Sequence, residues 1–83
     1  MVHVDLIEPD AGSCVQCTAT KRRMNKMGIG FSTFKASEKR DLIQELGVMQ
    51  APLVFVQGEG IKQFWTGFQP DKIKELGKML NIA

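Results

Sequence analysis

The stretch LVFVQGEGIKQFW, residues 53–65, predicts two strands joined by a tight turn. Its first part, residues 53–56, is continuously apolar, which is typical of a strand buried on both faces. Two glycines within residues 57–60 mark a hairpin turn, and residues 61–65 return as the next strand. The fold is therefore predicted to contain an antiparallel hairpin whose first strand is buried.

A strand and a helix are predicted at the start of the chain. Apolar and polar residues alternate over residues 2–6, which indicates a first strand. Residues 9–13 contain proline and glycine and are expected to form a loop. A helix should begin at residue 13 or 14 and run to about residue 27, where Gly28 ends it.

A second strand and helix are predicted before the hairpin. Residues 31–34 read as a short strand, and Ser37 can cap a helix that Gly47 terminates. The apolar face of this helix consists of Leu42, Ile43 and Leu46. A last helix should begin near Pro70, because proline is tolerated in the first turn of a helix.

The predicted order of elements is βαβαββα. Strands joined through a helix lie parallel with a right-handed crossover, and the last two strands form an antiparallel hairpin on the same sheet. A four-stranded mixed sheet with helices on both faces is an α/β thioredoxin fold. Residues 1–83 are expected to form one domain, because a chain this short supports a single core.

Composition excludes several classes of protein. The net charge of +2 gives no reason to expect nucleic acid, and no apolar run is long enough to cross a membrane. The N-terminus carries acidic residues within its apolar part, so it is not expected to be a signal peptide. Two cysteines are too few for a secreted disulfide scaffold, which favours a cytoplasmic protein. A monomer is expected.

One short segment is strongly basic. It contains Lys21, Arg22, Arg23 and Lys26 and lies on the first predicted helix. A solvated helix face is the favoured interpretation, and the alternative is a patch that steers an acidic partner.

A pair of cysteines, Cys14 and Cys17, lies where the first loop meets the first helix. Residues three apart on a helix have Cβ atoms about 5–6 Å apart, and a disulfide needs about 3.5–4.5 Å. A small adjustment of the first turn would therefore close the bond. In a reducing compartment a close pair of this kind is more often catalytic or metal-binding than structural.

The two thiols are not expected to be equivalent. A free thiol is only a few per cent ionised at neutral pH, and the N–H groups at a helix N-terminus favour the thiolate. Cys14 is nearer that end and is assigned as the nucleophile, whereas Cys17 lies one turn further in and is assigned as the resolving thiol. The reaction would pass through a mixed disulfide with the target.

Metal binding is the main alternative for these cysteines. A zinc site needs four ligands, and the only further candidate is His3, which is expected to be structural or at the surface. An iron–sulfur or other metal site shared between two chains stays open, since two chains could pool four thiolates. Two inert buried cysteines are a third interpretation.

Two other segments are unusual. Ala51-Pro52 precedes the buried strand, where Pro52 either starts the strand or forms a cis bond that faces the dithiol. In the second case Ala51 offers its backbone to an extended target segment. Residues 65–68, Trp-Thr-Gly-Phe, either pack in the core or form an exposed docking surface.

Three segments in this order resemble the NrdH-redoxins, which are glutaredoxin-like proteins. They are Cys-Val-Gln-Cys-Thr at 14–18, Gln-Ala-Pro-Leu-Val at 50–54, and Trp-Thr-Gly-Phe-Gln-Pro-Asp at 65–71. Many redox proteins share the two cysteines, so the tryptophan segment is the more specific part of the likeness. Ordinary glutaredoxins typically show Cys-Pro-Tyr-Cys, Thr-Val-Pro and a Gly-Gly-x-Asp element, which this chain lacks.

The resemblance implies an electron carrier of the thioredoxin fold. Such proteins are reduced by thioredoxin reductase, whose NADPH and FAD belong to the reductase, and they donate electrons to the large subunit of class Ib ribonucleotide reductase. No bound cofactor is expected in the redoxin itself. Cys14 and Cys17 match the redox pair. The implied partner-binding residues are Val15, Gln16, Ala51, Pro52, Trp65, Thr66, Gly67 and Phe68.

The chain also departs from the family pattern. Residues 10–12, Asp-Ala-Gly, are an apparent insertion, and Leu6 and Glu8 stand where Tyr and Lys are common. Gln69 stands where Arg is common. An acid near the dithiol would oppose thiolate formation.

The sequence thus predicts a thiol–disulfide oxidoreductase that reduces a class Ib ribonucleotide reductase. A general glutaredoxin that acts on glutathione mixed disulfides is the second interpretation, and an iron–sulfur or metal scaffold is the third.

Overall fold

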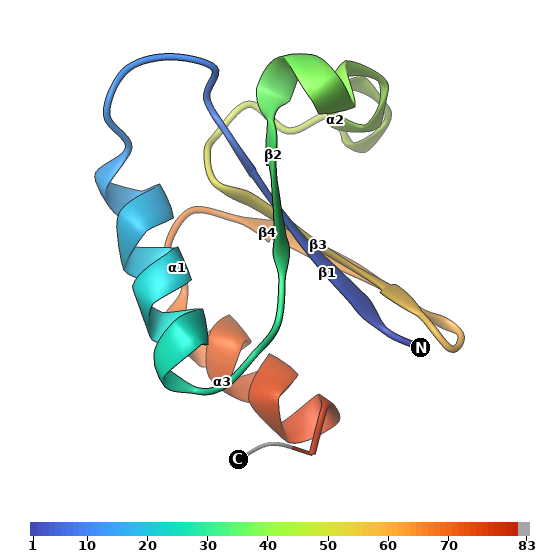
Figure 1. The fold of residues 1–83 in the computed structure, drawn as a ribbon. Coiled ribbons are helices and arrows are strands. Elements are labelled where there is room, and N and C mark those ends of the chain that lie inside the picture. The colour runs from blue at the N-terminus through green and yellow to red at the C-terminus, as the bar shows by residue number, and fades with distance from the viewer. Residues whose placement is uncertain (82–83) are drawn as a thin grey trace.

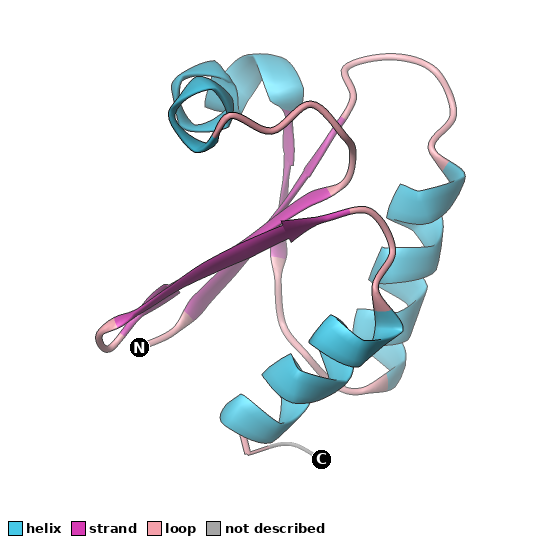
Figure 2. Cartoon of the chain, turned by 180° about the vertical axis from the view of Figure 1, so that it is seen from behind, coloured by secondary structure: helices cyan, strands magenta, loops and turns pink. Residues whose placement is uncertain are grey.

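A computed structural model describes residues 1–81, which form one mixed sheet with helices on both faces (Figures 1 and 2). The strands are β1 (His3–Glu8), β2 (Ser32–Lys35), β3 (Leu53–Gly58) and β4 (Ile61–Thr66). The helices are α1 (Val15–Lys26), the short 3-10 helix η1 (Ala36–Lys39), α2 (Arg40–Leu46) and α3 (Pro70–Met79). This is the βαβαββα order that the sequence predicts.

The sheet has the strand order β2-β1-β3-β4. β1 pairs with β2 in parallel, and β3 is antiparallel to both β1 and β4. The hairpin between β3 and β4 turns at Glu59 and Gly60, which both have positive φ. Two successive residues with positive φ make the turn that suits the right-handed twist of hairpin strands.

The main core lies between the sheet and the layer formed by α1 and α3. Alternate residues of β1 and β3 face this layer, and Trp65 of β4 joins them. The buried cluster consists of Val4, Leu6, Met24, Ile29, Val54, Val56, Trp65, Ile73 and Leu76. All four residues from Leu53 to Val56 are buried, which confirms the prediction of a strand covered on both faces.

The second helix begins differently from the prediction, and Ser37 is not its cap. Residues 36–39 form η1 before α2 begins. The carboxylate of Glu38 accepts from the backbone N–H of Lys35 at 2.9 Å, and Asp10 accepts from the N–H of Ser37. These two carboxylates satisfy two free N–H groups at the start of η1, so a 3-10 turn forms from Ala36, and α2 itself begins only at Arg40. Gly47 ends α2 with φ of 66°, as predicted.

α2 covers the opposite face of the sheet from α1 and α3 (Figures 1 and 2). Its apolar residues are only half-buried, so this layer is thinner than the main core. Among residues 1–81, no helix has both the length and the apolar character that crossing a membrane requires.

Candidate active site

Cys14 and Cys17 form a disulfide at the N-terminus of α1. Cys14 is the N-cap residue and has extended backbone angles, with φ of −135° and ψ of 95°. Its Cα lies 5.2 Å from that of Cys17. The pair therefore spans the boundary between loop and helix, as the sequence predicts.

The two sulfur atoms lie in different surroundings. Cys17 is 1% exposed, whereas Cys14 is half-buried. The backbone N–H of Cys17 donates to Cys14 Sγ at 3.1 Å. An N–H group in this position stabilises a thiolate on Cys14 after the disulfide is reduced. Access and hydrogen bonding thus both favour Cys14 as the attacking sulfur.

The segment before β3 contains a cis bond between Ala51 and Pro52. The side chain of Pro52 is fully buried, and Ala51 is half-buried. The carbonyl oxygen of Pro52 accepts from the N–H of Gly67 at 2.9 Å. This hydrogen bond joins two of the segments that resemble the NrdH-redoxins.

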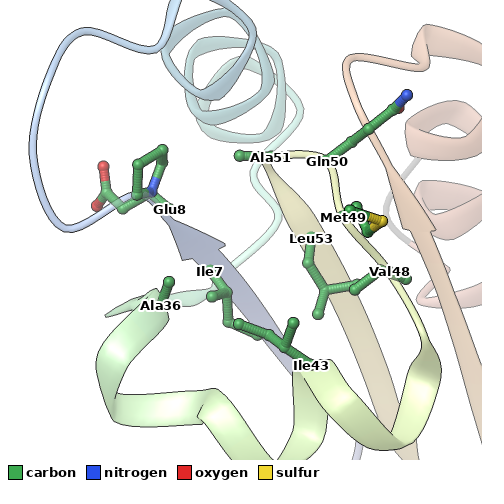
Figure 3. A pocket seen from close by; sticks show the side chains of 10 residues that line it. Ile7, Glu8, Ala36, Ile43, Val48, Met49, Gln50, Ala51 and Leu53 are labelled. Atoms are coloured by element: carbon green, nitrogen blue, oxygen red, sulfur yellow. The ribbon is translucent and has the colours of Figure 1, made fainter.

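The sequence did not reveal an apolar cavity of about 210 Å³ beside Ala51. Figure 3 shows Ile7 of β1, Ile43 of α2 and Leu53 of β3 around it. The loop that follows α2 completes the wall, and its Met49 is 98% exposed. The apolar face that the sequence predicts for α2, formed by Leu42, Ile43 and Leu46, is the one sequence signal that could have indicated this cavity.

Residues 65–68 divide between core and surface. Trp65 is 6% exposed and belongs to the main core, so its ring is not an exposed docking surface. Gly67 is also buried, whereas Thr66 and Phe68 are half-buried. The core-packing interpretation is therefore correct for Trp65, and only Thr66 and Phe68 reach the solvent with their side chains.

Gln16 connects the dithiol helix to this segment. Its Oε1 accepts from the N–H of Phe68 at 3.0 Å. Gly67 has φ of 79°, and a Cβ there would lie 2.9 Å from the same oxygen. Only glycine both adopts this conformation readily and leaves room for the Gln16 amide. Gln16, between the two cysteines, therefore has a positioning role within the fold.

The residues that depart from the family pattern make specific contacts. Glu8 accepts from Lys21 at 3.0 Å and lies 3.9 Å from Lys35, so two cations balance its negative charge. The amide of Gln69 donates to the carbonyl of Thr66 at 2.8 Å and closes the turn before α3.

The loop that contains Asp10 is tied to the start of η1. Asp10 Oδ1 accepts from the N–H of Ser37 at 2.9 Å. This hydrogen bond from the Ser37 backbone is the main cause that lowers the pKa of the Asp10 carboxyl, with smaller contributions from the Ser37 hydroxyl, Arg40 and Lys35. The carboxylate thus holds the loop that leads to Cys14.

We expect Asp10→Ala to lower the melting temperature at neutral pH and to have little effect in strong acid. Because the folded-state pKa is below its ordinary value of 3.8, the stabilisation is complete above that pH. It is lost as the pH falls through the lowered folded-state value. Thermal unfolding of the native protein and the variant, from neutral pH to about pH 2, measures this difference. A difference that grows in acid would contradict the assignment.

No group of three or more His, Cys, Asp or Glu side chains that could hold a metal comes together within residues 1–81. His3 is exposed on β1, so of the two expected positions, structural or at the surface, it has the second. The dithiol would therefore need a second chain to supply four thiolate ligands.

Comparison with known proteins agrees with this geometry. The glutaredoxin family model matches residues 12–61, which is more than half of the chain. The glutaredoxin-like protein NrdH of Escherichia coli strain K12 is 36% identical over 66 residues, and the match covers 76% of each chain. This chain belongs to the NrdH-redoxin family of glutaredoxin-like proteins.

Solved structures give the same result for the fold. NrdH-redoxin from Escherichia coli superposes with a TM-score of 0.71 at 30% identity, covering 89% of this chain and 93% of that one. A glutaredoxin from Archaeoglobus fulgidus has a TM-score of 0.66 at 22% identity, covering 92% and 86%, and supports the thioredoxin fold alone. This NrdH-type redoxin is a thiol–disulfide oxidoreductase with the Cys14–Cys17 pair as its redox group.

Proposed function

We propose that this redoxin carries electrons from thioredoxin reductase to the large subunit of a class Ib ribonucleotide reductase. The observation that carries the proposal is the placement of an accessible Cys14 beside a buried Cys17 in a chain of the NrdH-redoxin family. The resemblance of residues 65–71 to the NrdH-redoxin tryptophan segment supports the same partners.

The reaction is a two-electron thiol–disulfide exchange. The thiolate of Cys14 attacks one sulfur of the target disulfide, so a mixed disulfide forms and the other target sulfur leaves as a thiolate. Cys17 then loses its proton and attacks Cys14 Sγ. The second target thiol is released, and the Cys14–Cys17 disulfide remains. Thioredoxin reductase supplies the two electrons that return the pair to the dithiol.

The cavity beside Ala51 supports binding of an extended target segment. Its walls are largely apolar, and Ala51 precedes the fully buried Pro52. A side chain next to the target cysteine could enter this cavity while the main chain pairs with Ala51. We assign Val15, Ala51, Thr66 and Phe68 to partner contact, and Pro52, Trp65 and Gly67 to the buried framework beneath them. Gln16 is exposed and joins α1 to the loop of Phe68.

A preference for thioredoxin reductase over glutathione has two supports. The chain lacks the Gly-Gly-x-Asp element that the ordinary glutaredoxins carry. Separately, the solved NrdH-redoxin of Escherichia coli is described as having a thioredoxin-like activity profile. The proposal places the protein in the cytoplasm, because the dithiol must be regenerated in a reducing compartment. It also takes the protein to act as a monomer. It requires no bound cofactor, since NADPH and FAD belong to the reductase.

We expect thioredoxin reductase with NADPH to reduce this protein at least about 100-fold faster than glutathione does, which is about 2.7 kcal/mol in activation free energy. NADPH oxidation measures the first reaction. In a second assay with glutathione and glutathione reductase, NADPH oxidation measures how fast glutathione reduces this protein. The Cys14→Ser variant is the matched control and should be reduced in neither assay.

Electron donation to ribonucleotide reductase, the second half of the proposal, is tested with that enzyme present. With thioredoxin reductase and NADPH present, this protein should sustain deoxyribonucleotide formation by a class Ib ribonucleotide reductase. Efficient turnover with glutathione alone, together with no support of ribonucleotide reduction, would identify a general glutaredoxin instead.

A further inference from the structure

One face of α1 carries positive charge that is not neutralised by ion pairs within residues 1–81. Of the four basic residues in this helix, Lys21 pairs with Glu8 on β1. Arg22, Arg23 and Lys26 are exposed, and no ion pair within residues 1–81 involves them. α1 itself contains no acidic residue, whereas α3 mixes both signs and pairs Lys72 with Glu75.

These three cations surround a shallow hollow with an apolar floor. Arg22, Arg23 and Lys26 line it together with Ala19 and Phe68, and its volume is about 280 Å³. Phe68 comes from the loop after β4, and the hydrogen bond from its N–H to Gln16 holds that loop against α1. A favourable interaction with the C-terminal end of the helix dipole explains basic residues here, but it does not explain a hollow that a separate loop completes.

The hollow is continuous with the redox site. Val15 and Ala19 are four residues apart, as are Ala19 and Arg23, so the three lie on one face of the helix. Val15 follows Cys14 directly and is 81% exposed. A strip therefore runs along α1 from the attacking sulfur through apolar side chains to the three cations.

We infer that this strip binds an acidic segment of the partner that lies close in sequence to the disulfide being reduced. The occupant is a carboxylate-bearing peptide, because the rim of the hollow is cationic and its floor is apolar. From Cys14 to Arg22 and Lys26, α1 rises about 12–18 Å. An extended chain advances about 3.3 Å per residue, so the acidic residues should stand about four or five positions from the target cysteine.

This inference rests on the proposed function, but it can be tested without either reductase. Two synthetic peptides would carry the same internal disulfide, one with Glu at the fourth and fifth positions on each side and the other with Gln. The rate constant for their reduction by the pre-reduced native protein is measured after acid quenching. A failure of electron transfer from thioredoxin reductase would not affect this reaction.

At low ionic strength the native protein should reduce the Glu peptide about tenfold faster than the Gln peptide. The double variant Arg22→Glu/Arg23→Glu should lose or invert this preference while its rate on the Gln peptide stays within about twofold. A matched control, Lys62→Glu/Lys74→Glu, makes the same change in net charge on exposed residues of β4 and α3 and should keep the preference. Salt of about 1 M should abolish the preference in every protein that shows one.

Equal rates on the two peptides would overturn the inference. So would a preference that survives in Arg22→Glu/Arg23→Glu, or one that the control variant loses to the same extent, because net charge alone would then explain it.

Discussion

The Cys14→Ser variant is expected to reduce no disulfide, and the Cys17→Ser variant is expected to stop at a mixed disulfide with its target. Cys14 is the reachable sulfur and accepts a hydrogen bond from the N–H of Cys17, whereas Cys17 is 1% exposed. Without Cys14, the remaining thiol lies in the protein interior and cannot meet the target. Without Cys17, Cys14 still attacks, but no second thiol is available to release the product.

Mass spectrometry under non-reducing conditions measures both results. After incubation with an oxidised peptide, Cys17→Ser should carry one covalently bound peptide that dithiothreitol removes, and Cys14→Ser should remain unmodified. The double variant is the control for attachment through other groups. Adduct formation on Cys14→Ser but not on Cys17→Ser would reverse the assigned roles.

Replacing Trp65 with alanine is expected to have the largest effect on stability. Trp65 lies opposite Val54 in the sheet and fills the core beneath α1 and α3. Truncating a buried tryptophan costs about 3–5 kcal/mol. A domain of this length has a total stability of about 4–12 kcal/mol, so the variant should be largely unfolded at moderate urea concentrations.

Trp65→Phe separates the packing of the ring from its polar atom. The indole N–H of Trp65 is buried and makes no hydrogen bond within residues 1–81. Phenylalanine keeps most of the apolar contact and removes this unsatisfied donor, so we expect a loss below about 1.5 kcal/mol. Urea unfolding followed by far-UV circular dichroism compares both variants. Equal losses for phenylalanine and alanine would contradict this account.

Local sequence patterns were sufficient to predict the elements of the fold. The alternation in residues 2–6, the apolar run at 53–56 and the glycines after it act on the chain within a few residues. Helix ends at Gly47 and Pro70 depend on backbone preferences of single residues, and they were predicted correctly. The position of the cysteine pair also followed from the sequence, because a loop that meets a helix is a local feature.

Contacts between distant segments determine the position or the partner of three residues that the sequence pointed out. Trp65 could belong to the core or to the surface by sequence, and its pairing with Val54 places it in the core. The basic segment reads as one cluster, but Glu8 on β1 removes Lys21 from it. Ser37 has the side chain of a helix cap, yet its N–H donates to Asp10, 27 positions away, and the residue lies inside the 3-10 helix η1.

Local sequence patterns therefore specify the order of elements, from which the thioredoxin fold follows, and the position of the redox pair, because these patterns depend on neighbouring residues. The surroundings of that pair depend on contacts between distant segments. The hydrogen bond from Phe68 to Gln16 crosses 52 positions, and the cavity beside Ala51 is formed by β1, α2 and the start of β3. Contacts between distant segments depend on how whole elements pack against the sheet, and no local pattern records that packing.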